Sequence, residues 1–187
     1  MLCLTKAPSL LMNNSPPTLL VSIAGTVVVI KVRGRASFTA SADFKTLIQE
    51  LNKRGYERFI LDLSECLVMD STFLGVLASA GSKMANGMQG GRIARMELIQ
   101  PSPRVLDLLE NLGVAHLFTF VSSSDVLPAK FDSVETVQCE ASREELSRTC
   151  LEAHLTLMAL NPANVPRFKE VTKFLQEDLE KLRSPQG

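Results

Sequence analysis

The sequence has no excess of charge of either sign, because its 187 residues carry 20 lysines and arginines and 20 aspartates and glutamates. No global field therefore draws the chain to nucleic acid, and we expect no direct nucleic-acid binding. Long hydrophobic runs are also missing. The longest nearly apolar stretch, residues 19–30, is much shorter than the roughly 20 residues of a membrane helix. The N-terminus has no signal-peptide pattern, so we expect a cytoplasmic protein without a membrane span.

Residues that bind metals or activate substrates are few. The two histidines, His116 and His154, stand apart, and the four cysteines lack metal-ligand or C-x-x-C spacing. We therefore expect reduced cysteines, no metal site and no cofactor. The glycine motifs that cradle nucleotide phosphates are missing as well, which argues against a nucleotide-dependent enzyme. A serine–histidine–aspartate triad stays open on sequence grounds, although His116 fits a packing role better.

A receiver domain phosphorylated on Asp62 is a further alternative, because Asp62 ends a predicted strand. Such a domain needs an acidic pair after its first strand to hold Mg²⁺. The first acidic residue of the chain is Asp43, so this alternative is disfavoured.

Hydrophobic periodicity predicts short strands that alternate with helices. A hairpin is expected over 19–32 with its turn at Gly25-Thr26, and Ser41 is the expected N-cap of the first helix. The helices are expected over 41–53, 71–86 and 102–112, and the later strands over 59–63, 93–99 and 117–121. The pattern predicts an α/β fold with a mixed β-sheet packed against α-helices.

The chain beyond the sheet is expected to be helical. We predict a flexible lead-in at 1–18, in which Met12 is an alternative start, a globular domain at 19–121, a polar linker at 122–140 and a helical extension at 141–187. Within the extension, Ser142 and Glu145 have capping-box spacing, and helices near 142–160 and 165–182 form a hairpin. Such a hairpin must bury its apolar residues against the body of the protein or against a second copy of the chain. Packing against a second copy would give a homo-oligomer. The residues expected to be buried are Leu151, Leu155, Phe168 and Leu175.

One stretch carries a specific signal. It runs from Leu61-Asp62-Leu63-Ser64 through Met69-Asp70-Ser71-Thr72-Phe73-Leu74-Gly75. This pattern resembles the signature of STAS domains, the fold of the anti-sigma factor antagonists. Later landmarks also fit, among them Gly90-Gly91, Pro103-Arg104-Val105 and Leu112-Gly113-Val114. The resemblance covers about 19–121, and it implies a STAS-type mixed sheet packed with helices, followed here by the C-terminal helical hairpin.

The resemblance also implies a function. In the family, the unphosphorylated domain binds an anti-sigma factor that is itself a serine kinase, and so releases a sigma factor. The kinase phosphorylates the motif serine, and a cognate phosphatase restores it. This role transfers to Ser71, with Thr72 as the fallback acceptor, and the protein would then be a binding module and not an enzyme. The alternative is a STAS scaffold or accessory subunit in another signalling or transport assembly.

The residues around Ser71 can be interpreted without the family. Asp70 and Ser71 lie where a buried strand turns into an apolar helix, so both are N-cap candidates. A helix N-terminus also tolerates a phosphate, so capping and phosphorylation are compatible. We expect Asp70 to present Ser71, and Met69, Phe73 and Leu74 to supply an apolar contact zone for the partner. Arg33 and Arg35 are expected to flank the same edge. Phe73 departs from the family, which has glycine there, and a ring at this position could restrict access to Ser71.

Overall fold

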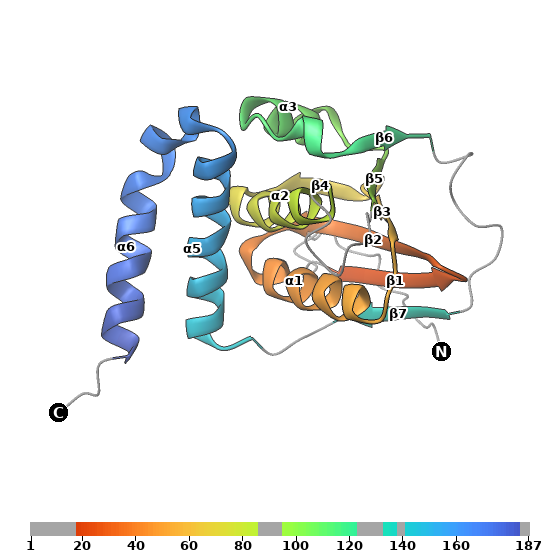
Figure 1. Cartoon of the computed structure of the whole chain (residues 1–187), viewed down its shortest axis with the longest axis horizontal. Helices are drawn as coiled ribbons and strands as arrows, with labels where there is room; N and C mark the ends of the chain where they lie inside the picture. Colours follow the sequence, from red (N-terminus) through yellow and green to blue (C-terminus); the bar gives the residue numbers. More distant parts are fainter. Residues whose placement is uncertain (1–17, 86–94, 123–132, 138–140, 184–187) are drawn as a thin grey trace, which may run out of the picture.

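A mixed β-sheet, covered on one face by helices, forms the centre of the chain (Figure 1). The computed structural model describes residues 18–85, 95–122, 133–137 and 141–183. In chain order the elements are β1 (Thr18–Ala24), β2 (Val27–Ala36), α1 (Phe38–Lys53), β3 (Arg58–Asp62), β4 (Cys66–Met69), α2 (Ser71–Ala85), β5 (Arg95–Ile99), α3 (Pro103–Asn111), the 3-10 turn η1 (Ala115–Leu117), β6 (Thr119–Val121), β7 (Ser133–Val137), α5 (Arg143–Leu160), the 3-10 turn η2 (Pro162–Asn164) and α6 (Val165–Arg183).

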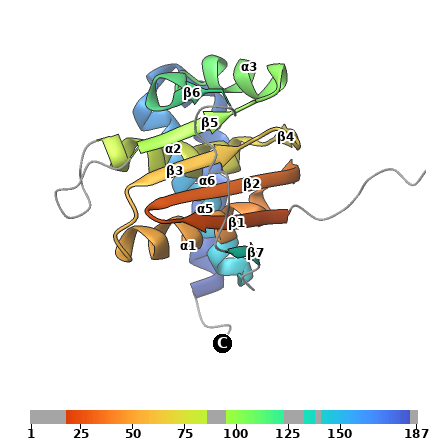
Figure 2. The ribbon, with the colours of Figure 1, turned by 90° about the vertical axis from the view of Figure 1, so that its right-hand side faces the viewer.

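The sheet combines an antiparallel hairpin with parallel strands, as predicted. Its order is β6-β5-β3-β2-β1-β7, and β4 pairs with the end of β2 (Figure 2). β1 and β2 pair antiparallel around Gly25, whose φ of 58° suits a tight turn. β2, β3, β5 and β6 are parallel neighbours. The carboxyl ends of the parallel strands share one edge, and α1 and α2 both begin there.

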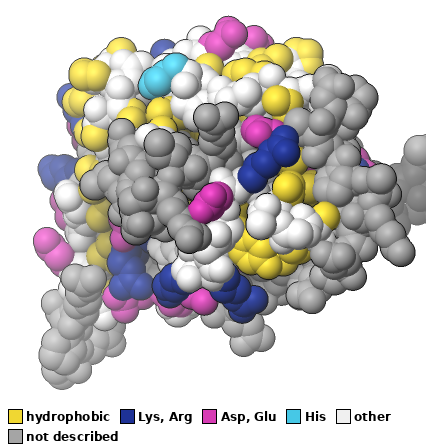
Figure 3. All heavy atoms as spheres, turned by 45° about the vertical axis from the view of Figure 1, so that its right-hand side comes forward, with side chains coloured by type: hydrophobic (Ala, Val, Ile, Leu, Met, Phe, Trp, Pro, Cys, Tyr) yellow, Lys and Arg dark blue, Asp and Glu magenta, His cyan; other side chains and the backbone are white. Residues whose placement is uncertain are grey.

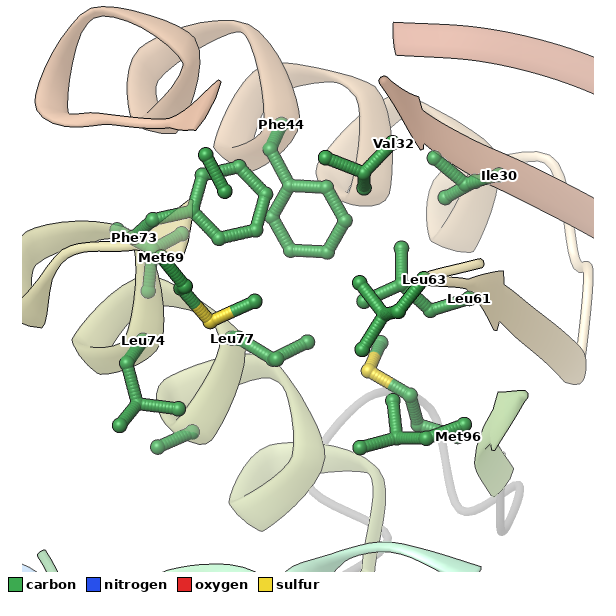
Figure 4. Close-up of a cluster of buried hydrophobic side chains, with 14 of the residues drawn as sticks. Ile30, Val32, Phe44, Leu61, Leu63, Met69, Phe73, Leu74, Leu77 and Met96 are labelled. Carbon is green, nitrogen blue, oxygen red and sulfur yellow. The ribbon is translucent and has the colours of Figure 1, made fainter. Parts of the chain in front are cut away.

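The hydrophobic core lies between the sheet and the layer formed by α1 and α2 (Figure 4). Phe44 of α1 and Phe73 of α2 are fully buried, with ring centroids 5.0 Å apart. Alternate residues of β2 face this core: Ile30 and Val32 pack under the rings, while Val29 belongs to a small cluster on the opposite face of the sheet. The helix layer is thus fixed by large apolar side chains on its sheet side.

The first helix begins earlier than the sequence predicts. α1 starts at Phe38 with Ser37 as its N-cap, so the expectation that Ser41 caps it is wrong. Ser41 is completely buried within the helix, and its hydroxyl donates to the carbonyl of Ser37 at 3.0 Å. The early start depends on a distant residue, because the N–H of Phe38 donates to the carboxylate of Asp70.

Two strands lie where the sequence analysis predicts none. β4 occupies 66–69 and pairs parallel with the end of β2. β7 lies inside the predicted linker 122–140, and it extends the sheet by pairing antiparallel with β1. Both strands are short and depend on a partner strand, so local sequence patterns do not reveal them. The rest of that linker (123–132 and 138–140), the lead-in at 1–17 and residues 86–94 and 184–187 lie outside the described residues.

The C-terminal helices form the predicted hairpin. α5 packs across α1 and α2, and α6 packs on the outer side of α5 (Figure 1). Asn164 in the intervening turn is fully buried, and its amide donates to the carbonyls of Leu112 and Leu157 at 3.0 and 2.9 Å. These bonds tie the turn of the hairpin to the end of α3.

The face that α5 turns to the body differs from the expected one. Leu155 is 41% exposed, so the expectation that it is buried is wrong. The buried residues of α5 are Thr149, Ala153, His154 and Leu157. They recur at helical spacing, but most are small or polar, so a search for apolar residues selects the wrong side of the helix.

The capping box at the start of α5 is formed as predicted, and it makes the helix sensitive to acid. Ser142 Oγ accepts from the N–H of Glu145, and the Glu145 carboxylate accepts from the N–H of Ser142 at 2.8 Å. This hydrogen bond holds the pKa of Glu145 below its usual value of 4.5. A lowered folded-state pKa stabilises the helix above the unfolded-state value, and the stabilisation is lost as pH falls through the folded value.

We therefore expect hydrogen exchange in the first turn of α5 to accelerate as pH falls below about 4.5, after correction for intrinsic exchange rates. The Glu145→Gln variant should lack this part of the pH dependence, because its side chain does not titrate. Identical pH profiles for the two proteins would show that Glu145 does not control the start of the helix.

Candidate functional site

Asp70 organises the edge of the sheet where α1 and α2 begin. Its N–H donates to the carbonyl of Ala36 at 2.9 Å, which fixes the end of β4 against the end of β2. Its two carboxylate oxygens then accept from two different helices. Oδ1 accepts from the N–H of Phe73 in α2 at 2.9 Å, and Oδ2 accepts from the N–H of Phe38 in α1 at 2.7 Å. One side chain therefore caps both helices that cover the core.

Ser71 is the first residue of α2, and its hydroxyl faces the C-terminal hairpin. Ser71 is half-buried, and its Oγ lies 2.9 Å from Nε2 of His154 in α5. The other ring nitrogen of His154, Nδ1, lies 2.8 Å from the backbone carbonyl of Cys150. A carbonyl only accepts, so Nδ1 carries a proton, and in the neutral ring Nε2 is the acceptor. With this tautomer the Ser71 hydroxyl donates to His154.

Thr72 is more deeply placed than Ser71. It is buried, and its hydroxyl lies 3.3 Å from Sγ of Cys150. Burial raises the pKa of the Cys150 thiol, which keeps it protonated. Of the two hydroxyls in the motif, that of Ser71 is the less buried.

The expected apolar contact zone is not at the surface. Met69, Phe73 and Leu74 have side chains that are no more than 6% exposed, and all three point into the core (Figure 4). The prediction that they meet a partner directly is wrong for this structure. The reason is that β4 and α2 turn these large side chains toward the hydrophobic core. The ring of Phe73 likewise points away from Ser71 and does not restrict access to it.

Arg33 lies apart from Ser71. Alternation along β2 places Lys31 and Arg33 with Val29, on the sheet face that the helices leave open. There both side chains pair with Glu65, at 2.7 and 2.8 Å, and the hydrogen bond from Lys31 lowers the pKa of the Glu65 carboxyl. Figure 3 shows basic side chains lying beside acidic ones on this side of the molecule. Arg35 is exposed and lies opposite Val68 in β4, nearer to the start of α2.

No pattern in the sequence indicates that His154 and Cys150 meet the motif. Their spacing of four residues places both on one face of α5, but nothing in the sequence links that face to Ser71. A hollow of about 70 Å³ lies between α1, α2 and α5, and neither Ser71 nor His154 lines it. Among the described residues, no group of three potential ligands could hold a metal ion. Nor does this part of the chain contain a helix long and apolar enough to cross a membrane.

Comparison with known proteins identifies the segment that carries the motif. A family model described as the STAS domain matches residues 19–126, more than half of the chain. No curated protein matches the sequence. Similar solved structures include the anti-sigma factor antagonist SpoIIAA in its unphosphorylated form, 17% identical over 57% of this chain and 90% of that chain with a TM-score of 0.49. An anti-sigma factor antagonist from Mycobacterium paratuberculosis is 19% identical over 59% and 89%, with a TM-score of 0.49. The phosphorylated form of Bacillus SpoIIAA is 17% identical over 58% and 94%, with a TM-score of 0.47.

Proposed function

The chain belongs to the STAS domain family, and we propose on this premise that it is an anti-sigma factor antagonist. In this proposal the protein is a cytoplasmic binding module and not an enzyme. It sequesters an anti-sigma factor of the serine-kinase type and so releases a sigma factor. Phosphorylation of Ser71 ends the interaction, and a cognate phosphatase restores it.

The observation that carries the proposal is the position of Ser71. Within the matched segment, it is the first residue of α2, directly after the residue that caps the helix. The free N–H groups and positive dipole end of a helix N-terminus tolerate a phosphate. A phosphate adds about −1.5 to −2 charges at neutral pH, which suffices to repel an acidic partner surface. A modification here changes binding without requiring the domain to unfold.

The surface that we assign to the partner differs from the one that the sequence suggests. Asp70 and Ser71 lie at its centre, and Arg35 is exposed beside β4. Met69, Phe73 and Leu74 support this surface from beneath, because their side chains belong to the core. Arg33 contributes charge on the other face of the sheet, where it pairs with Glu65.

Substitutions at Ser71 test the proposal directly. Ser71→Ala should bind the partner and resist phosphorylation. Ser71→Asp should bind about 1–3 kcal/mol more weakly, which is the usual cost of a desolvated like-charge contact. α2 should survive both changes, because the cap is Asp70. The measurement is co-purification of each full-length variant from the native host, with intact-mass analysis and phosphosite mapping of the wild type.

Equal recovery of the same partner with both variants, and phosphate elsewhere or nowhere, would refute the switch. Recovery of a stable assembly that ignores the charge at position 71 would instead support a scaffold or accessory role in another signalling or transport complex.

A further inference from the structure

The residues that cover Ser71 come from outside the STAS domain. His154 and Cys150 belong to α5, and the family match ends at residue 126. His154 is only 5% exposed, and its ring packs on that of Phe168 in α6, with centroids 4.8 Å apart. Both helices of the hairpin therefore contribute to the cover over the motif serine.

The cover is a close helix crossing. A Cβ added at Gly75, one turn along α2 from Ser71, would lie 2.5 Å from the carbonyl oxygen of Ala153 and 2.7 Å from its Cβ. Two helices approach this closely only where both present small residues. The face of α2 next to Ser71 thus fits a helix with a small residue opposite Gly75, and α5 supplies that helix.

The two sides of α2 differ in composition. The difference favours separation of α5 from α2 over separation of α2 from the sheet. The sheet side of α2 is lined by large apolar side chains, whereas on the α5 side Ser71, Thr72 and Gly75 meet a face of α5 that is mostly small or polar, with Leu157 as its one large apolar member among the buried residues. The hydroxyls, thiol and imidazole that separation exposes can bond to water, so the main cost is the exposure of Ala153 and Leu157. The hollow of about 70 Å³ beside this crossing is partly lined by Gln49, Asn52 and Lys83, so packing there is incomplete. This contact resembles the more polar interfaces at which parts of a chain move relative to one another.

We propose that the α5–α6 hairpin is a built-in competitor for the surface around Ser71, and that negative charge on Ser71 expels it. In the docked state, the hairpin covers the hydroxyl and the adjoining face of α2, so a partner binds there only in competition with it. The role of this device in signalling rests on the proposed function, whereas the exclusion itself concerns only this chain.

The geometry opposes a phosphate at position 71 beneath α5. The gap between Ser71 Oγ and His154 Nε2 is one hydrogen bond long, so a phosphate does not fit without moving the helix. The Asp70 carboxylate precedes Ser71 and adds like charge. The ammonium of Lys45 is already paired with Glu152 of α5. Charge on Ser71 and displacement of the hairpin are therefore coupled in both directions. A change that displaces the hairpin must also expose Ser71.

The reactivity of Cys150 reports docking without a partner. In a full-length chain carrying Cys3→Ser and Cys139→Ser, the remaining thiols are Cys150 and the buried Cys66. We measure labelling of Cys150 by a maleimide, read by mass after digestion. Ala153→Leu overfills the crossing with Gly75 and should speed labelling about tenfold or more. The matched control is Ala159→Leu, the same change at an exposed position of α5, which should label at the parent rate.

Ser71→Glu is the decisive variant. It should speed Cys150 labelling about tenfold or more and raise hydrogen exchange throughout α5, whereas Ser71→Ala should stay within about threefold of the parent. The Ala85→Glu control adds the same charge at an exposed position of α2. Labelling of Ser71→Glu at the parent rate, in an assay where Ala153→Leu labels fast, would overturn the proposal, because the hairpin would then accommodate the charge. The proposal would also be overturned if Ala153→Leu labelled at the parent rate and hydrogen exchange in α5 were unchanged. In that case α5 would not separate from α2.

Phosphosite mapping of the same chains in the host separates the two proposals. If Ala153→Leu carries more phosphate on Ser71 than the parent, docking controls access to the site. If labelling responds as expected and Ser71 carries no phosphate in either chain, the exclusion holds and the proposed function fails.

Discussion

Replacing Phe73 with alanine should lower the free energy of unfolding by about 3–5 kcal/mol, the usual cost of deleting a buried aromatic ring. Phe73 is fully buried, and its ring lies 5.0 Å from that of Phe44 between α1, α2 and the sheet. Alanine keeps the backbone N–H that bonds to Asp70, so the change isolates the packing of the ring. The measurement is equilibrium unfolding in urea, compared at equal slope.

The matched control is Phe174→Ala in α6, where the ring is 65% exposed. That substitution should change stability by no more than about 0.5 kcal/mol. Similar losses for the two variants would mean that the packing between α1 and α2 does not depend on the Phe73 ring.

The position of Phe73 also explains how the chain tolerates a ring where the family has glycine. A side chain at this position points toward the sheet and meets Phe44, so the extra volume fills the core and leaves Ser71 untouched (Figure 4). The departure from the family pattern therefore concerns how α1 packs on α2, and it gives no reason to exclude Ser71 as the regulated residue.

Patterns within a few residues predicted some parts of the fold well. The strand predicted over 59–63, the start of α2 and the capping box at Ser142 each depend on neighbours in the chain, and the structure contains all of them. The start of α1 was misplaced because its cap partner, Asp70, is 32 residues from Phe38. β4 and β7 were missed for the same reason, since each exists only by pairing with a strand far away in the sequence.

At the candidate site, too, local features are predicted from the sequence and long-range contacts are not. The sequence identifies Ser71 and Asp70 from the motif, but it assigns the apolar residues beside them to a partner, although the core needs them. The contact between Ser71 and His154 joins residues 83 positions apart, so no local pattern predicts it. Hydrophobic periodicity does not indicate this contact either, because the face that α5 buries is mostly small and polar.

Replacing Asp70 with alanine should have the second-largest effect, because one carboxylate serves two helices. Each cap is worth about 0.5–2 kcal/mol, so losing both should lower the free energy of unfolding by about 1–4 kcal/mol. The Asp70→Asn variant should fall between wild type and Asp70→Ala, since its single amide oxygen can accept from only one of the two N–H groups. Urea unfolding gives the totals, and hydrogen exchange at the first turns of α1 and α2 shows which helix loses its cap.

The matched control is Asp107→Ala, the same substitution at an exposed position of α3. It should change stability by no more than about 0.5 kcal/mol. If Asp70→Ala loosened the start of α2 alone, the bond to Phe38 would contribute nothing to α1. If both starts loosen together, the residue before Ser71 couples the two helices that carry the partner surface. The serine is then held in place by the same carboxylate that fixes α1, and substitutions at Asp70 will alter binding through position as well as through charge.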